Sequence, residues 1–266
     1  RLERQGLLDR ELESLPTRKQ VAERIEAKEG LSTPELSVLM AYTKIVLADA
    51  ILESDLPDDP FLRTDLFSYF PSPMRHTYRE QMLGHPLRRE IIVTQVVNEL
   101  VNGAGITFFH RLSEETGAGP EELVRANFVA REVFGSRALI DEINSYDNKI
   151  DADVQTRMRL EVRTLVERAS RWLITNRRSP MDSEGTVDFF DVLAQRVTAA
   201  LPELLTGREL EAFHDRRDAL LDAGVPEELA IKIAGLPPAY AALSIVETAK
   251  RDDVDPMDVA RVHYAL

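Results

Sequence analysis

The sequence predicts an all-α fold, a multi-helix bundle of roughly twelve helices. Apolar residues recur every three or four positions through most of the 266 residues, which is the spacing of one helix face. Capping residues and prolines stand where these stretches begin, and glycines stand where many of them end. No stretch shows the sustained alternation of apolar and polar residues that is typical of a half-buried strand.

The first predicted helix begins at residues 17–20, which have capping-box spacing, and ends at Gly30. Thr33 followed by Pro34 predicts the next N-terminus, and the run 34–54 is apolar over so wide a face that we expect this helix to be central. The same signals, including a further capping box at 206–209, predict helices over about 60–69, 73–82, 85–102, 106–116, 120–134, 136–147, 187–204, 207–222, 226–234, 238–250 and 256–265.

The longest predicted element is a long central helix over about 151–178. Its apolar residues step by four and three positions, which predicts a seam for a partner helix: Met158, Val162, Leu165, Ala169 and Trp172. The segment 179–185 is rich in turn-forming residues and is the predicted linker. It divides a main helical domain (17–178) from a C-terminal helical lobe (179–266), and the alternative is one continuous domain.

Composition excludes several classes of protein. The 46 Asp and Glu residues outnumber the 33 Lys and Arg residues, giving a net charge of −13, so a general nucleic-acid binder is not expected. The sequence contains no apolar run long enough for a membrane span, so we expect no membrane partner. It contains no cysteine, so disulfides, thiolate nucleophiles and cysteine metal sites are excluded, and a reducing, cytoplasmic compartment is the expectation.

The chain contains residues of the types that bind cofactors or metals or take part in catalysis, but they do not form a catalytic pattern. Gly103-Ala104-Gly105 and Gly117-Ala118-Gly119 begin like dinucleotide-binding loops, but they follow helices rather than strands, so helix-terminating turns are the better interpretation. His214-Asp215 lacks the further ligands of a metal phosphohydrolase. The acidic clusters at 58–59, 147–153 and 252–255 lack calcium-loop spacing, and helix caps explain Asp151 and Asp255. We therefore predict no catalytic, cofactor-binding or metal-binding residue in this chain.

Two polar patterns allow alternative interpretations. The predicted long helix is rich in arginine, which indicates either a salt-bridging face or a docking face for an acidic partner: Arg157, Arg159, Arg163, Arg168, Arg171, Arg177 and Arg178. Thr94, Asn98 and Asn102 lie four residues apart on one stripe, which is either an exposed polar face or an amide network between helices.

Several short sequence segments, spread over nearly the whole chain, together resemble a known family. They are Leu7–Glu13 with Leu15-Pro16, Leu31–Lys44, Tyr69-Phe70-Pro71, His85–Ile91, Asn98 with Val101-Asn102, Gly105–Phe108, Asp147-Asn148-Lys149, Arg171-Trp172-Leu173 and Asp255-Pro256-Met257. With these segments the chain resembles the C-terminal helical region of the large bacterial NAD-dependent glutamate dehydrogenases.

This resemblance implies a parent enzyme that oxidatively deaminates L-glutamate to 2-oxoglutarate and ammonia with NAD. Its catalytic and nucleotide-binding residues would lie upstream, so the resemblance assigns no catalytic residue and no cofactor to this chain. Residues 1–16 would be a connector from the catalytic domain, and the partners would be that domain and further copies of the full-length enzyme. The chain would have a structural, interdomain or regulatory role. The alternative is an independent interaction module that docks a partner through the long helix and its arginines.

Overall fold

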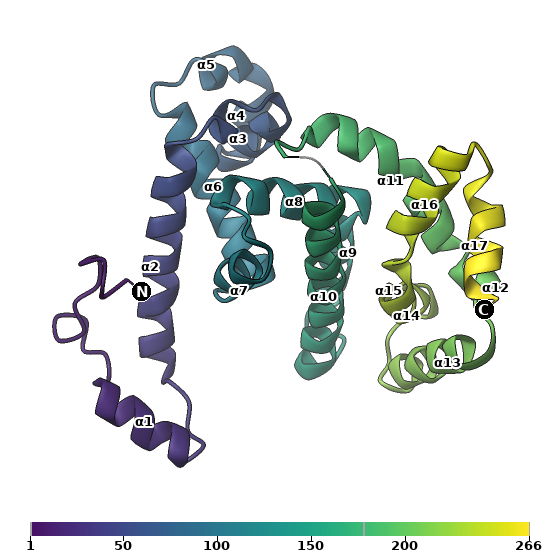
Figure 1. The fold of residues 1–266 in the computed structure, drawn as a ribbon, viewed down its shortest axis with the longest axis horizontal. Coiled ribbons are helices and arrows are strands. Elements are labelled where there is room, and N and C mark those ends of the chain that lie inside the picture. The colour runs from purple at the N-terminus through teal and green to yellow at the C-terminus, as the bar shows by residue number, and fades with distance from the viewer. Residues whose placement is uncertain (1, 178, 266) are drawn as a thin grey trace. The chain divides into compact units, whose positions relative to one another are not determined.

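The computed structural model describes residues 2–177 and 179–265, and in these ranges it contains helices and no strand (Figure 1). Arg1, Arg178 and Leu266 lie outside the described residues, as do the side chains of 63–65. The predicted all-α class is confirmed. The number of helices exceeds the predicted twelve, because several predicted helices are divided by short breaks. The chain forms two compact units, Arg1–Phe108 and Phe109–Leu266, which we call unit 1 and unit 2.

Unit 1 is built on helix α6, which carries more of its buried apolar side chains than any other described element of the unit. Helices α2 and α3 pack against α6. The elements of this unit are α1 (Arg18–Glu26), α2 (Thr33–Leu52), the short 3-10 turns η1 (Leu56–Asp58) and η2 (Pro60–Leu62), α3 (Arg63–Tyr69), α4 (Ser72–Thr77), α5 (Arg79–Leu83) and α6 (Arg88–Ala104).

Unit 2 is built on helix α8, in which every residue from Leu123 to Ala130 is buried. The predicted long helix is confirmed as α10, and it packs along α8 with α11 on another side of α8. The elements are α7 (Phe108–Thr116), α8 (Pro120–Val133), α9 (Ser136–Asn144), α10 (Ala152–Asn176), α11 (Ser183–Ala199), α12 (Leu201–Leu204), α13 (Gly207–Asp222), α14 (Glu227–Ala234), α15 (Leu236–Ala239), α16 (Ala242–Asp252) and α17 (Pro256–Tyr264).

The predicted seam of α10 is confirmed for all but its last residue. Met158, Val162, Leu165 and Ala169 are buried. Trp172 is only half-buried, and its ring makes a T-shaped contact with that of Phe190, whose side chain is fully buried. Trp172 therefore contributes less to the core than the size of its ring suggests.

The predicted linker at 179–185 is partly helical. Asp182 caps helix α11 by accepting a hydrogen bond from the backbone N–H of Gly185, so the second half of the linker forms the first turn of this helix. Elements on both sides of the linker belong to unit 2. The division of the chain into domains at residue 179 stays a prediction.

Two predicted helix starts are wrong in detail. Helix α2 is capped by Ser32 rather than Thr33, and Glu35 completes the capping box by accepting a hydrogen bond from the backbone N–H of Ser32 at 2.6 Å. At α13, Thr206 makes no capping hydrogen bond. Its hydroxyl donates instead to the carbonyl oxygen of Tyr264 at 2.6 Å, because helix α17 ends beside it.

The expectation that the helix over 34–54 is central is wrong for this chain. Only Thr43, Leu47 and Ile51 of α2 are buried, and they form the side that packs on α6. Ile45 lies on the opposite side of the helix with 54% of its surface exposed. The apolar sequence of α2 predicted that most of the helix surface would be buried. In unit 1 the helix is buried on one side only. In the described part of the chain, no single helix is both long and apolar enough to cross a membrane.

Candidate functional site

Both glycine-containing candidates lie at helix ends, as predicted. Helix α6 ends at Ala104, and Gly105 follows it with a φ of 87°. Gly117 follows α7 with a φ of 77°, and Gly119 is the N-cap of α8. A left-handed backbone favours glycine for steric reasons, so these residues are accounted for by chain reversal alone.

The His214-Asp215 pair and the acidic clusters are not assembled into a cation site. Both side chains of the pair are exposed on α13. Asp151 and Asp255 are the predicted caps of α10 and α17, and each accepts a backbone hydrogen bond at 2.8 Å. Within residues 2–177 and 179–265, no three His, Asp or Glu side chains are grouped so that they could hold a metal ion.

Four arginines on α10 or directly after it are engaged inside unit 2, whereas Arg157 is exposed and Arg163 is half-buried. Hydrogen bonds join Arg159 to Asn144 Oδ1 at 2.9 Å, Arg168 to the carbonyl of Pro237 at 3.2 Å and Arg171 to Glu115 Oε2 at 2.9 Å, and Arg177 forms an ion pair with Glu247 Oε1 at 3.4 Å. The pattern matches the salt-bridging interpretation of this face. It gives no support to a docking face, although that alternative stays open; Arg178 lies outside the described residues.

The polar stripe on α6 serves to tie two helices of unit 1 together. Lys44, on α2, donates from its Nζ to Asn98 Oδ1 at 2.8 Å and to Asn102 Oδ1 at 3.1 Å. Thr94 instead donates to the carbonyl of Glu90 in its own helix. Neither interpretation is right as stated, because the stripe is partly exposed but two of its amides link α6 to α2 through a lysine.

A first candidate site is the side of α2 that faces away from α6. Val38, Ile45 and Leu52 lie seven residues apart, so they form one stripe, which we call the outer face of α2. Ile45 is exposed and the other two are half-buried. An apolar stripe of this length on a helix surface is typical of a contact with another polypeptide segment.

The outer face begins close to the N-terminus of α2, where an ion pair stabilises the first turn of the helix. Arg24, at the end of α1, pairs with Glu35 at 2.8 Å. The hydrogen bonds from Arg24 and from the backbone of Ser32 lower the pKa of Glu35 to about 2. This pair joins α1 to the first turn of α2, close to the point where the outer face begins.

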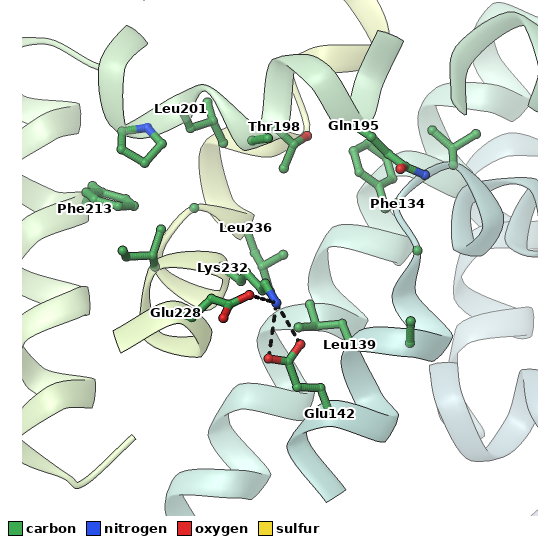
Figure 2. A pocket seen from close by; sticks show the side chains of 17 residues that line it. Phe134, Leu139, Glu142, Gln195, Thr198, Leu201, Phe213, Glu228, Lys232 and Leu236 are labelled. Carbon is green, nitrogen blue, oxygen red and sulfur yellow. Dashed lines mark hydrogen bonds and ion pairs between the residues drawn. The ribbon is translucent and has the colours of Figure 1, made fainter. Parts of the chain in front are cut away.

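A second candidate site is a pocket of about 460 Å³ within unit 2 (Figure 2). It lies among the end of α8 and helices α9, α11, α12, α13 and α14. Its walls are mostly apolar, and the side chains labelled in Figure 2 are Phe134, Leu139, Glu142, Gln195, Thr198, Leu201, Phe213, Glu228, Lys232 and Leu236. This volume is in the range of small-molecule pockets, about 300–1,000 Å³.

The polar side of this pocket is an ion cluster centred on Lys232. Its Nζ donates to both carboxylate oxygens of Glu142, at 3.1 and 3.2 Å, and lies 3.0 Å from Glu228 Oε1. Figure 2 shows both carboxylates converging on the ammonium group. The hydrogen bonds to Glu228 and Glu142 raise the pKa of Lys232. The Glu228 side chain is 83% exposed, so this cluster lies where the pocket opens to solvent.

Thr198 lines the pocket, but its hydroxyl oxygen is buried out of reach of solvent, and therefore of a molecule in the pocket. Among the residues that the structure describes, its Oγ1 is one of few buried side-chain atoms without a hydrogen-bond partner. Sequence reasoning missed the pocket, because its walls come from segments up to about a hundred residues apart and no local motif marks them.

Comparison with known proteins identifies a family whose match covers both candidate sites. Residues 28–266 match the family described as "Glutamate dehydrogenase, C-terminal". The chain is similar to proteins named NAD-specific glutamate dehydrogenase from Halomonas elongata (39% identity over 100% of the chain), Pseudomonas aeruginosa (38% over 100%) and Mycobacterium tuberculosis (33% over 97%).

In each case the chain spans 16% of the relative's length. The similarity runs through both units, and the family match includes the outer face of α2 as well as the pocket residues. The chain therefore belongs to the glutamate dehydrogenase C-terminal family.

Proposed function

We propose that this chain is a non-catalytic helical domain of a large NAD-dependent glutamate dehydrogenase, and that it packs against the rest of the same polypeptide. The parent enzyme would convert L-glutamate, NAD and water to 2-oxoglutarate, ammonia and NADH. It would be a cytoplasmic homo-oligomer, with NAD bound outside this chain. The similarity to three proteins named NAD-specific glutamate dehydrogenase supports the activity of the parent.

The observation that carries the packing role is the outer face of α2. This helix is apolar around most of its circumference, yet α6 covers one side of it only. Since relatives are about six times longer than the chain, they contain ample polypeptide to cover the outer face. Within this proposal, residues 1–16 connect to the catalytic domain, and residues 17–178 and 179–266 form the main domain and the C-terminal lobe.

The arginines of α10 do not favour the alternative role as an independent interaction module. Such a module needs several cationic groups that are available to a partner, whereas four of the six described arginines, Arg159, Arg168, Arg171 and Arg177, have acceptors within unit 2. An affinity-capture experiment separates the two roles, because a packing domain should retain the upstream polypeptide and a module should retain a different protein.

The test co-expresses this chain with the upstream part of the same polypeptide and measures their association and activity. We expect the chain to capture the upstream part, and Ile45→Glu to weaken the capture at least tenfold, because a charge would be buried in an apolar contact. Val192→Glu is the matched control, since Val192 is 74% exposed on α11 in unit 2.

Two results would contradict the proposal. One is equal capture by the Ile45→Glu and Val192→Glu variants, which would place the contact elsewhere. The other is turnover of glutamate, or tight binding of NADH, by this chain alone. Either activity would require catalytic or nucleotide-binding residues that the proposal assigns to the upstream polypeptide.

A further inference from the structure

We propose that the outer face of α2 is one half of a close-packed pair of helices, and that its partner is an amphipathic α-helix of the upstream polypeptide with a basic edge. This inference rests on the packing role proposed above and names the kind of segment that fills it. It follows from three features of α2: its two opposite apolar faces, the order of large and small residues on the outer face, and the charges along one edge of that face.

Helix α2 has two apolar faces on opposite sides. Leu47 is buried on the side that packs on α6. Ile45 precedes it by two residues, which places the two side chains about 160° apart around the helix axis, and it is exposed. The N-terminal segment reaches the edge of the outer face at Tyr42, whose hydroxyl donates to Glu13 Oε1 at 2.6 Å, but Ala41 and Ile45 stay exposed. The middle of the outer face is therefore open to another segment.

The spacing of the outer face indicates that this segment is a helix. Its residues advance by three and four positions in turn: Val38, Ala41, Ile45, Ala48 and Leu52. A repeat of this kind faces a partner helix that crosses it at a small angle. The alanines between the large residues allow the two helix axes to approach to the lower end of the usual range of about 8–10 Å. Large side chains of the partner would fill the space above each alanine, so that the two faces interdigitate.

The charges along one edge of the outer face define the edge of the partner helix. Asp49 and Glu53 are exposed and lie four residues apart, so they are neighbours on this edge. In the part of the chain that the structure describes, neither carboxylate has a hydrogen bond or an ion pair. Lys44 does not neutralise them, because its ammonium group donates to the amides of α6. A lysine or arginine of the partner helix would relieve the repulsion between the two carboxylates.

The source of the partner helix is the polypeptide outside this chain. The chain spans 16% of the length of each relative, so most of such a protein is available to supply a helix. A second copy of the outer face is a poorer occupant. In an antiparallel pair of copies the same edge of each helix lies on the same side of the seam, so the two acidic edges would repel each other.

The experiment places a photo-reactive residue on the outer face in the full-length polypeptide. Val38, Ile45 and Leu52 are replaced one at a time by p-benzoylphenylalanine, and the peptides that cross-link on irradiation are identified by mass spectrometry. We expect all three to cross-link to one upstream segment, at sites that advance in one direction by about seven residues per step, because seven helical residues span about 10 Å. An extended segment would cover this distance in about three residues. The same replacement at the exposed Val192 on α11 is the control and should give no cross-link to that segment.

Two pairs of variants, combined with the photo-reactive residue at position 45, test the close approach and the charged edge. Ala41→Leu occupies the space of a partner side chain, so the cross-linking yield should fall by about threefold or more. Ala152→Leu, the same change at an exposed position on α10, should leave the yield unchanged. Asp49→Lys should lower the yield about twofold at low ionic strength, whereas Asp188→Lys, at an exposed position on α11, should not.

The possible failures separate this inference from the packing role. Cross-links to the upstream polypeptide whose sites do not advance, or advance by about three residues per step, would overturn the helical partner and leave the packing role intact. Cross-links to a second copy alone, or none from any of the three positions, would overturn both. Equal yields from Ala41→Leu and Ala152→Leu would reject the close-packed pair, and equal yields from Asp49→Lys and Asp188→Lys would reject the basic edge.

Discussion

The two units of this chain bury their apolar residues to different extents. In unit 2, helix α8 is surrounded by α9, α10 and α11, and all of its residues from Leu123 to Ala130 are buried. In unit 1, α2 is longer and more apolar, but it buries only Thr43, Leu47 and Ile51. Unit 2 therefore completes its core with its own helices, whereas unit 1 presents apolar surface of the kind that a second polypeptide segment covers.

The exposed apolar side chains show the same contrast. In unit 2 they lie on separate elements, four on helices and one in the loop between α16 and α17: Leu160, Val192, Leu221, Val262 and Val254. In the shorter unit 1 they are more numerous and include several large rings and chains: Leu7, Leu12, Ile25, Leu36, Ile45, Tyr69, Met74, Tyr78 and Leu87. Single exposed residues are ordinary on protein surfaces, but a concentration of them in one unit indicates an interaction region.

The largest expected effect is the loss of a fully buried aromatic ring in unit 2. Phe190→Ala removes a ring that packs against Trp172 and Phe189, so we expect the free energy of unfolding to fall by about 3–5 kcal/mol. Urea denaturation followed by circular dichroism measures this change. Val192→Ala, two residues away on the same helix and exposed, should change it by about 0.5 kcal/mol or less. Equal effects of the two variants would contradict the packing of unit 2.

The next prediction compares the loss of stability on substituting a residue on each of the two sides of α2 in unit 1. Leu47→Ala should lower the free energy of unfolding by about 2–5 kcal/mol, because this side chain is buried against α6. Ile45→Ala should cost about 0.5 kcal/mol or less in this chain, since Ile45 is exposed. The same urea titration tests both variants. If Ile45→Ala is as destabilising as Leu47→Ala, the outer face is already covered within the chain, and the contrast between the units fails.

A smaller effect concerns the hydroxyl that links α13 to the end of α17 in unit 2. Thr206→Val keeps the shape of the side chain but removes its hydrogen bond to the carbonyl of Tyr264. We expect a loss of about 1 kcal/mol, visible as a lower Tm and as faster hydrogen exchange in the last turn of α17. In unit 1, Thr17→Val removes a local cap of α1 at a similar cost, but it should leave exchange in the neighbouring helix unchanged.

The smallest effect is a pH-dependent one at the start of α2. The pKa of Glu35 is lowered from 4.5 to about 2, so the ionised carboxylate stabilises the folded chain above about pH 4.5. This contribution is lost as the pH falls from about 4.5 to 2. The Tm of Glu35→Gln should therefore be lower than that of the unchanged chain at pH 7 and should converge with it near pH 2. Glu211→Gln, at an exposed position on α13, is the control and should show no such convergence.

Local signals in the sequence predicted local structure well. Thr17, Asp151 and Asp255 are caps as expected, because an N-cap is determined by residues two or three positions away. The period of α10 predicted its buried side for the same reason. The cap at Thr206 failed because Tyr264, which is 58 residues away, competes for the hydroxyl.

Features that depend on distant parts of the chain could not be predicted in this way. The apolar run of α2 indicates that the helix needs cover, but its sequence does not say which segment provides it. The ion pair of Lys232 with Glu142 joins residues 90 positions apart, and the pocket exists only when α9 and α14 are brought together. The candidate sites therefore became visible with the fold, whereas the fold class was visible in the sequence.

Helix α10 has a mechanical consequence for unit 2. It is one uninterrupted helix of 25 residues, which is roughly 37 Å long at 1.5 Å per residue. Arg159, in its third turn, is hydrogen-bonded to Asn144 at the end of α9, and Arg177, just beyond its last residue, is paired with Glu247 on α16. The length of α10 therefore sets the separation between these two attachment points inside unit 2.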